Sequence, residues 1–319
     1  MKRKCSLFLC FVFMLLAFPV LKPNVSARGS YIFVSPTGSS SSFCSQADPC
    51  NPATALQRAN DGDLLIFKGG TYTRSTTGPI LKITKAVSLI GGWDGKPIGP
   101  FLPDPKLYET IIDGENGRQL IEINTSSPEV IHISGITFKN GNASDGVYCG
   151  GAILVKDGGT VIESCRFENN YAYSVGGAIC VESNDRFEVK NNLFIENEAK
   201  NGGGAIGILR EITSPDVAII ERNHFIENSA NYASAIEVSR SSVIINANLI
   251  ANNNASSAIL VTSGQKVKIT NNIIYWDTRV GDFNSAITDY YEEGETTEVI
   301  NNTIVNVTMG IRALHDAKM

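Results

Sequence analysis

The chain has 319 residues, a hydrophobic fraction of 43% and a formal net charge of −5 at pH 7. This acidic balance argues against nucleic acid as a partner, because phosphate binding depends on lysine and arginine. The three histidines, His132, His224 and His315, lie far apart in the sequence, and no Cys-x-x-Cys pair occurs. The sequence therefore indicates neither a zinc site nor a cofactor.

Residues 1–27 have the pattern of a secretory signal peptide. A basic start is followed by an apolar run over residues 5–20 and by the small-residue site Val25-Ser26-Ala27. The run spans about 16 residues, which is short for a membrane helix of about 20. We therefore expect a secreted or cell-surface protein with no transmembrane segment after cleavage. The leader holds four basic residues, so its removal leaves 23 basic and 32 acidic residues and a net charge of about −9.

The segment after the leader, residues 28–130, predicts an N-terminal cap and the first irregular coils of a repeat. Residues 31–34 and 63–67 are apolar enough to form strands, and residues 69–72, which begin with two glycines, predict a turn. Residues 52–60 form the one plausible helix. A short amphipathic helix at this place would cover the open end of a solenoid.

Five cysteines follow the leader. Cys44 and Cys50 enclose a short polar loop in a chain with an export signal, which favours a local disulfide over two free thiols. The pairing of Cys149, Cys165 and Cys180 stays open, since an odd number of cysteines leaves one unpaired or bonded between chains.

Residues 131–319 repeat themselves at spacings of roughly 23–31 residues, which has to be explained before any local motif. One series begins Gly150-Gly151-Ala152-Ile153 and returns at Gly176, Gly203 and, in weaker form, at Ser234, Ser257, Ser285 and Met309. A second series consists of Phe138, Phe167, Phe194 and Phe225, continued by Ile250, Ile274 and Ile304.

Apolar residues alternate within each repeat with a period of two, as in Ile153/Val155 and Ile179/Val181, which is typical of strands and excludes helical repeats. Each repeat holds three such segments. Three strands per repeat bury their inward side chains only when each pairs with its equivalent one coil later. The sequence therefore predicts an all-β right-handed parallel β-helix; the repeat length does not suit a β-propeller, and the spacing does not suit a leucine-rich repeat.

Two columns of asparagine accompany the repeat. Asparagine tolerates a left-handed backbone at a bend, and stacked amides can hydrogen-bond to one another. We interpret both columns as structural ladders rather than sugar contacts. The first consists of Asn192, Asn223, Asn248, Asn272 and Asn302, with Cys165 in the preceding slot, and the second of Asn170, Asn197, Asn228 and Asn253.

The pairing of Gly177-Ala178-Ile179 with Phe194-Ile195-Glu196-Asn197 resembles the repeats of chlamydial polymorphic outer-membrane proteins. The opening residues 31–38, with Gly62-Asp63 and Gly70-Thr71-Tyr72, resemble the start of exported pectin-lyase-like β-helix proteins. These similarities imply a β-helix used as a surface or adhesion module. They also imply polysaccharide cleavage as an alternative, although the Asn-Thr-Asp, Asp-Asp and Gly-His-Gly motifs of the similar hydrolases do not occur here.

Glu196 and Glu227 are weak candidates for catalysis. They occupy equivalent positions in successive repeats, so they would stand about one strand spacing, roughly 4.8 Å, apart. Two such carboxylates can perform acid–base chemistry or hold a metal, whereas two solvated corner residues need no function. We favour the corner interpretation, and with it no metal.

Aromatic residues that enter the Gly-Gly-Ala-Ile strands offer a possible contact face. Small alanines would form a flat floor beside them, suited to a glycan or a protein surface. The residues are Tyr171, Tyr173, Tyr232, Trp276, Tyr290 and Tyr291. The leading hypothesis is a non-catalytic secreted or cell-surface module that binds glycan or protein. The alternative is a lyase or hydrolase acting on an acidic polysaccharide.

Overall fold

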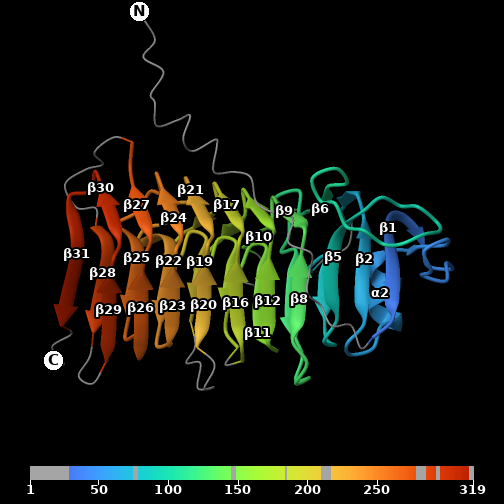
Figure 1. The fold of residues 1–319 in the computed structure, drawn as a ribbon, viewed down its shortest axis with the longest axis horizontal. Coiled ribbons are helices and arrows are strands. Elements are labelled where there is room, and N and C mark those ends of the chain that lie inside the picture. Colours follow the sequence, from blue (N-terminus) through green and yellow to red (C-terminus); the bar gives the residue numbers. More distant parts are fainter. Residues whose placement is uncertain are drawn as a thin grey trace, which may run out of the picture.

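The computed structural model describes residues 29–74, 78–144, 149–183, 185–209, 217–277, 285–291 and 295–315. The expected signal peptide lies outside these residues. Strands stack along one long axis, from β1 (Tyr31–Ser39) beside the helix α2 (Pro52–Arg58) at one end to β31 (Met309–His315) at the other (Figure 1).

Three long parallel sheets and one short one are formed by the described residues, with ten, nine, nine and three strands. Sheet A continues from β1 through β2 (Leu64–Lys68), β5 (Ser88–Trp93), β8 (Ile131–Ser134), β12 (Thr160–Glu163), β16 (Phe187–Lys190), β20 (Ala218–Glu221), β23 (Val243–Asn246), β26 (Lys266–Thr270) and β29 (Thr296–Ile300). Sheet B contains β3 (Gly70–Tyr72), β6 (Thr110–Asp113), β9 (Ile136–Lys139), β13 (Arg166–Glu168), β17 (Leu193–Ile195), β21 (His224–Ile226), β24 (Leu249–Ala251), β27 (Ile273–Tyr275) and β30 (Thr303–Val305).

Sheet C ends at β31 and is preceded in chain order by β4 (Leu81–Ile83), β7 (Ile121–Asn124), β11 (Ile153–Asp157), β15 (Ile179–Val181), β19 (Ile206–Ile208), β22 (Ala233–Ser239), β25 (Ser257–Thr262) and β28 (Ser285–Tyr291). Sheet D is a small addition of β10 (Asn142–Ala143), β14 (Tyr171–Ala172) and β18 (Glu198–Ala199). Each coil passes through sheets A, B and C, and each strand pairs with its equivalent in the next coil. The predicted right-handed parallel β-helix with three strands per coil is confirmed.

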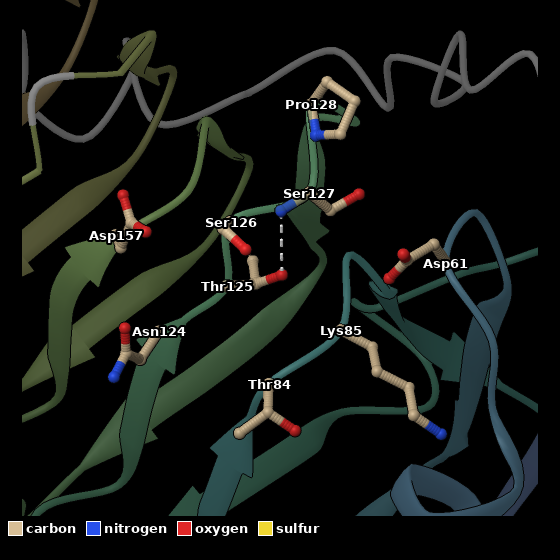
Figure 2. Close-up of a pocket in the computed structure, with 9 residues that line it drawn as sticks. All are labelled: Asp61, Thr84, Lys85, Asn124, Thr125, Ser126, Ser127, Pro128 and Asp157. Atoms are coloured by element: carbon tan, nitrogen blue, oxygen red, sulfur yellow. Dashed lines mark hydrogen bonds between the residues drawn. The ribbon is translucent and has the colours of Figure 1, made fainter.

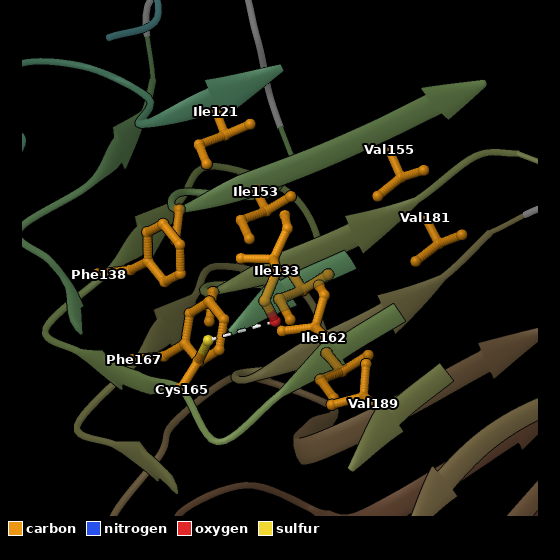
Figure 3. Packing of buried hydrophobic residues seen from close by; sticks show 14 of the residues in the cluster. Ile121, Ile133, Phe138, Ile153, Val155, Ile162, Cys165, Phe167, Val181 and Val189 are labelled. Atoms are coloured by element: carbon orange, nitrogen blue, oxygen red, sulfur yellow. Dashed lines mark hydrogen bonds between the residues drawn. The ribbon is translucent and has the colours of Figure 1, made fainter. Parts of the chain in front are cut away.

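The interior is filled by the alternating side chains of all three sheets (Figure 3). Phe138, Phe167, Phe194 and Phe225 stack face to face, with ring centroids 4.7–5.0 Å apart. Their spacing equals the distance between paired strands, so one aromatic column runs along the core of sheet B.

The two glycines of each Gly-Gly pair are required for different structural reasons. Gly176 has a φ of 68°, a backbone conformation that residues with a Cβ rarely adopt. Gly177 lies so close to the next coil that an added Cβ would come within 2.2 Å of the carbonyl oxygen of Gly204. The alanine that follows, Ala178, is fully buried in the core. The expectation of a flat alanine floor on the surface is therefore wrong, because these alanines point inward.

The first asparagine column lies where the chain turns from sheet A to sheet B. Asn223 donates its side-chain amide to Oδ1 of Asn248 at 3.1 Å and to the carbonyl of Val189 at 2.9 Å, and its own Oδ1 accepts from Asn192. Left-handed backbone occurs one residue earlier, for example at Arg222 with a φ of 54°. The column is thus set by amide hydrogen bonding rather than by asparagine's tolerance of that conformation. The same bonds join Asn248, Asn272 and Asn302.

The N-terminal end departs from the expected pattern at one strand. Gly70–Tyr72 forms β3 and pairs with Thr110–Ile112 in β6, so the predicted turn is wrong. Tyr72 points into the core, and its hydroxyl donates to the carbonyl of Lys68 at 2.8 Å. Strand pairing and the burial of this ring outweigh the turn preference of the glycines. Helix α2 ends at Arg58, before the expected end at residue 60, and packs against β1 and β4.

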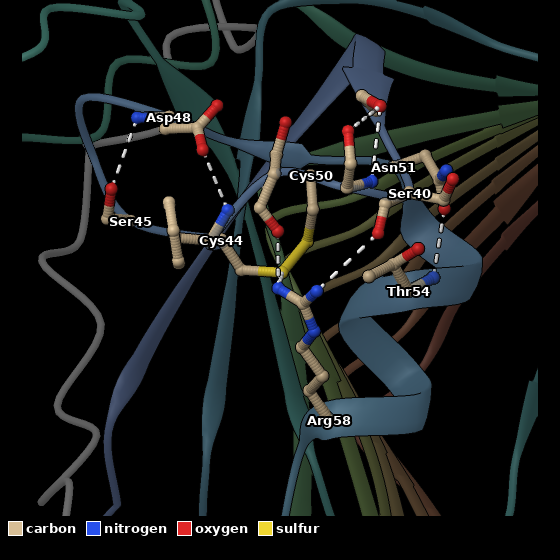
Figure 4. The surroundings of a disulfide bond; sticks show 12 residues. Ser40, Cys44, Ser45, Asp48, Cys50, Asn51, Thr54 and Arg58 are labelled. Carbon is tan, nitrogen blue, oxygen red and sulfur yellow. Dashed lines mark hydrogen bonds between the residues drawn. A yellow bond between two sulfur atoms is a disulfide. The ribbon is translucent and has the colours of Figure 1, made fainter.

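Cys44 and Cys50 form a disulfide beside α2 (Figure 4). The guanidinium of Arg58 donates to the carbonyl of Ser42, and Phe43 N donates to Asp48 Oδ2 at 2.8 Å, so the loop is fixed at several points.

A second disulfide joins Cys149, in the loop before β11, to Cys180 on β15 in the next coil. Cys165 is free and buried (Figure 3), and burial raises the pKa of its thiol to about 12. This pairing, which the sequence left open, depends on loop positions that no spacing rule contains.

Candidate functional site

The corner after sheet B holds Glu196 and Glu227, the two candidate catalytic carboxylates. Both are exposed and have left-handed backbone, with φ values of 52° and 56°. They follow β17 and β21, which are paired in register, so they occupy equivalent positions of adjacent coils. Neither side chain has a hydrogen bond or ion pair with any other described residue. This geometry supplies no partner that would orient them for catalysis.

Two other carboxylates of the described coils, Glu122 and Glu188, are held in ion pairs with two basic residues each. Glu122 on β7 lies 3.0 Å from Lys82 and 3.0 Å from Lys156, which come from the strands on either side. Burial alone would raise the pKa of Glu122, but the hydrogen bonds from the two lysines outweigh it, and the pKa is lowered. Glu188 on β16 is paired with Arg186 and Lys190 of the same segment, and its pKa is likewise lowered. The pairs of Glu122 tie three coils together, and both carboxylates stay charged at neutral pH.

A polar cleft opens at the carboxyl ends of the first strands of sheet C (Figure 2). Its volume is about 410 Å³. Thr84 and Lys85 follow β4, residues 124–128 end and follow β7, and Asp157 ends β11. Asp61, from the loop between α2 and β2, closes the opposite side.

Several side chains that line the cleft already form hydrogen bonds within the protein. Oδ1 of Asp61 accepts from the backbone N–H of Ala86 at 2.7 Å. The ammonium of Lys85 donates to the carbonyls of Gln57 and Ala59 at the end of α2. Thr125 is buried, and its hydroxyl accepts from Ser127 N at 3.3 Å. These bonds fix the position of the cleft walls.

Three of the remaining lining side chains are available to a ligand. The side chains of Asn124, Ser126 and Asp157 make no hydrogen bond to other described residues. An amide, a hydroxyl and a carboxylate together offer both donors and acceptors. Ligand specificity in pockets depends on a few polar groups placed in this way. The cleft is therefore suited to a hydroxyl-rich molecule.

Sequence reasoning missed the cleft, although one signal was available. A polar residue closes or follows each of three successive sheet C strands, at Thr84, Asn124 and Asp157. Parallel strands in register place such residues at one edge. Asp61 has no comparable signal, because it belongs to a loop outside the repeat.

The expected aromatic face is only partly exposed. Tyr173 and Tyr232 are 44% and 59% exposed, and the ammonium of Lys200, from the coil between them, lies 4.3 Å from the centre of the Tyr173 ring. Trp276 is instead buried, and its indole N–H donates to the carbonyl of Asn253. Tyr171 belongs to sheet D, and Tyr290 and Tyr291 belong to β28.

No group of three or more His, Cys, Asp or Glu side chains is placed to hold a metal ion within the described residues. The same residues include no helix long and apolar enough to cross a bilayer.

Comparison with known proteins supports the architecture. The family model described as "Right handed beta helix region" matches residues 110–275. Among solved structures, the chain is similar to the pectate lyase Pel9A, with 14% identity, a TM-score of 0.40, and coverage of 92% of this chain and 80% of that one. It is also similar to the catalytic domain of a GH87 α-1,3-glucanase, with 12% identity, a TM-score of 0.32, and coverage of 95% and 68%. No curated protein sequence matches. The family match covers more than half of the chain, coincides with the regular coils seen here, and establishes that the protein belongs to the right-handed β-helix family.

Proposed function

We propose that this protein is a non-catalytic β-helix module, secreted or displayed at the cell surface, that binds a glycan in the polar cleft of Figure 2. The observation that carries the proposal is the set of uncommitted polar groups, Asn124, Ser126 and Asp157, at the carboxyl ends of the paired strands β7 and β11. The surrounding backbone is fixed, so binding requires little reordering of the protein.

Sugar hydroxyls both donate and accept hydrogen bonds, which suits this mixture of amide, hydroxyl and carboxylate. The exposed rings of Tyr173 and Tyr232 offer additional apolar surface on later coils of the solenoid, ahead of β15 and β22. A protein partner is the second possibility that the sequence left open; the cleft favours a glycan because its lining is polar.

Export is supported by two independent features. Residues 1–27 have the pattern of a signal peptide, and the disulfides Cys44–Cys50 and Cys149–Cys180 are typical of proteins in oxidising compartments. The resemblance of the repeats to those of chlamydial polymorphic outer-membrane proteins suggests an adhesion role.

The experiment is a glycan-array screen of the chain from residue 28 onward, followed by calorimetric titration of each hit. Asn124→Ala and Asp157→Asn should each weaken binding by about tenfold, which corresponds to roughly 1.4 kcal/mol for a hydrogen bond to a ligand. Glu196→Gln is the matched control and should bind as the wild type does. Absence of any glycan hit, or equal affinity of all variants, would contradict the proposal.

The competing function is polysaccharide cleavage, by hydrolysis or by a lyase reaction, and one feature favours it. Asp61 and Asp157 line the same cleft from opposite sides, and two carboxylates flanking a sugar are the usual machinery of glycoside hydrolysis. Pectins, alginates and neutral glucans should be incubated with the protein, with and without calcium, while reducing ends and ultraviolet absorbance are followed. Turnover lost in Asp157→Asn would establish an enzyme in the cleft, and turnover lost in Glu196→Gln or Glu227→Gln would assign catalysis to the corner.

A further inference from the structure

A second cavity, of about 310 Å³, lies at the corner where the first coils turn from sheet A to sheet B. It is bounded by residues that follow β2 and β5 and by a turn that precedes β6. The polar cleft lies at a different corner, beyond the ends of sheet C strands. We infer that this second cavity binds one ring of a neutral sugar, independently of the cleft.

The wall contains an indole whose hydrogen-bonding capacity is unused. Trp93 is 1% exposed and packs edge-on against Phe33, with ring centroids 4.9 Å apart. Its Nε1–H has no acceptor among the described residues. A buried donor without an acceptor destabilises a fold by about 1–3 kcal/mol, so a ligand that brought an acceptor to this indole would relieve that cost.

Two further lining residues offer apolar surface on a hydrogen-bonded turn. Leu107 and Tyr108 belong to a turn in which their backbone N–H groups donate to the carbonyl of Asp104. Leu107 is 68% exposed although it borders a cavity. A phenol ring and an aliphatic side chain on a hydrogen-bonded turn form the kind of surface on which the C–H face of a sugar packs.

Two glycines, Gly69 and Gly70, contribute only backbone to the lining. The N–H of Gly69 donates to the carbonyl of Trp93 at 2.9 Å, and that of Gly70 donates to the carbonyl of Glu109 at 2.8 Å. A Cβ on Gly69 would lie about 3.0 Å from the backbone of Tyr108, so glycine permits the turn to approach. The backbone of this part of the lining is therefore held by hydrogen bonds, and the two glycines add no side chains to it.

The charges around the cavity favour a neutral ligand. Lys68 supplies a cation, and Glu109 supplies a carboxylate that also accepts from the hydroxyl of Thr137 at 2.9 Å. Asp94 is paired with Lys96 at 2.8 Å. A ligand of either charge would meet a like charge, whereas sugar hydroxyls can donate to the carboxylate and accept from the ammonium. The volume is at the lower end of ligand pockets, roughly 300 Å³, which suits a single ring rather than a long chain.

The test uses the two tryptophans of the chain, Trp93 and Trp276, as reporters. The protein is labelled with fluorotryptophan and titrated with cellotetraose, xylotetraose and mannotetraose, while fluorine NMR follows both indoles. Trp276→Phe assigns the signals, and if it fails to fold, Trp93→Phe assigns them instead. We expect a saturable shift of the Trp93 signal with at least one sugar and no shift of Trp276.

Two variants decide the location. Tyr108→Ala should weaken the Trp93 response by about tenfold or more, because it removes the stacking surface of the cavity. Asp157→Asn, in the polar cleft, should leave the response unchanged. A response that persists in Tyr108→Ala, or no saturable shift with any of the three sugars, overturns the inference. Because Asp157→Asn affects only the cleft, failure of the proposed function and failure of this second site give different results.

Discussion

Single glycines allow the backbones of adjacent coils to approach closely. Gly151, Gly177 and Gly204 each lie within 2.4 Å, measured from an added Cβ, of a carbonyl oxygen in the next coil. These glycines precede β11, β15 and β19, and their backbone N–H groups donate to carbonyls of the next coil, so the backbone cannot move without breaking those bonds. The repeated glycine pair is therefore a geometric requirement of the fold rather than a sign of flexibility.

Gly177→Ala should lower the free energy of unfolding by about 2 kcal/mol or more, because overpacking against backbone cannot be relieved by a change of rotamer. The control is Gly117→Ala, where the nearest atom to the added Cβ is 3.7 Å away and φ is not positive. That variant should unfold at the wild-type urea concentration or slightly above it. Equal unfolding midpoints for the two variants would contradict this account of the motif.

Alternation within each strand separates core from surface, and sheet B provides adjacent residues to test it. Ile274 on β27 is fully buried, whereas Ile273 is 47% exposed. Ile274→Ala should cost about 2–5 kcal/mol of unfolding free energy, as for other buried aliphatic truncations. Ile273→Ala should change it by less than about 0.5 kcal/mol. Urea titration followed by circular dichroism measures both, and similar costs would mean that the inward and outward assignments are wrong.

Strands β4, β7 and β11 are also joined on their outer face by the ion pairs of Glu122. The lysines hold the pKa of this carboxyl below its usual range despite burial. A carboxyl with a lowered folded-state pKa stabilises the protein above its unfolded pKa of about 4.3, and this contribution disappears as the pH falls through the folded value. Glu122→Gln should therefore reduce the melting temperature at pH 7 and have little effect at pH 3. Glu298→Gln, which removes an exposed pair with Lys268, is the control and should have little effect at either pH.

The repeat made most elements predictable, because inward side chains recur with a fixed offset from the phenylalanine column. Sheet D was not predicted, although Ala143, Ala172 and Ala199 each follow that phenylalanine by five residues. Strands of two residues are too short for alternation to reveal them. The cleft was not predicted either, since Asp61 reaches it from a loop without a repeat partner. Contacts that depend on loop paths leave no periodic signal in a single sequence.

The stability of a solenoid is roughly the sum of its coils and of the interfaces between them, so one polar residue in the core weakens its own end of the molecule. The column of inward-facing side chains in sheet C is apolar along most of its length, but near the last strand it includes a carboxylate. Its members from β11 onward are Val155, Val181, Ile208, Val238, Val261, Asp289 and Ala313. Burial raises the pKa of Asp289, and one of its carboxylate oxygens is buried without a partner among the described residues.

Hydrogen exchange followed by mass spectrometry should reveal this gradient. Amides of β28 and β29 should exchange faster than those of β15 and β16, because opening the last coils exposes less apolar surface and releases a buried carboxylate to water. Asp289→Val should slow exchange in β28 and β29 and leave β15 unchanged. Glu298→Val, an outward substitution on β29, is the matched control and should not slow it. Faster exchange in Asp289→Val would show that the carboxylate stabilises the last coils, and uniform exchange along the molecule would show that the coils open as one unit.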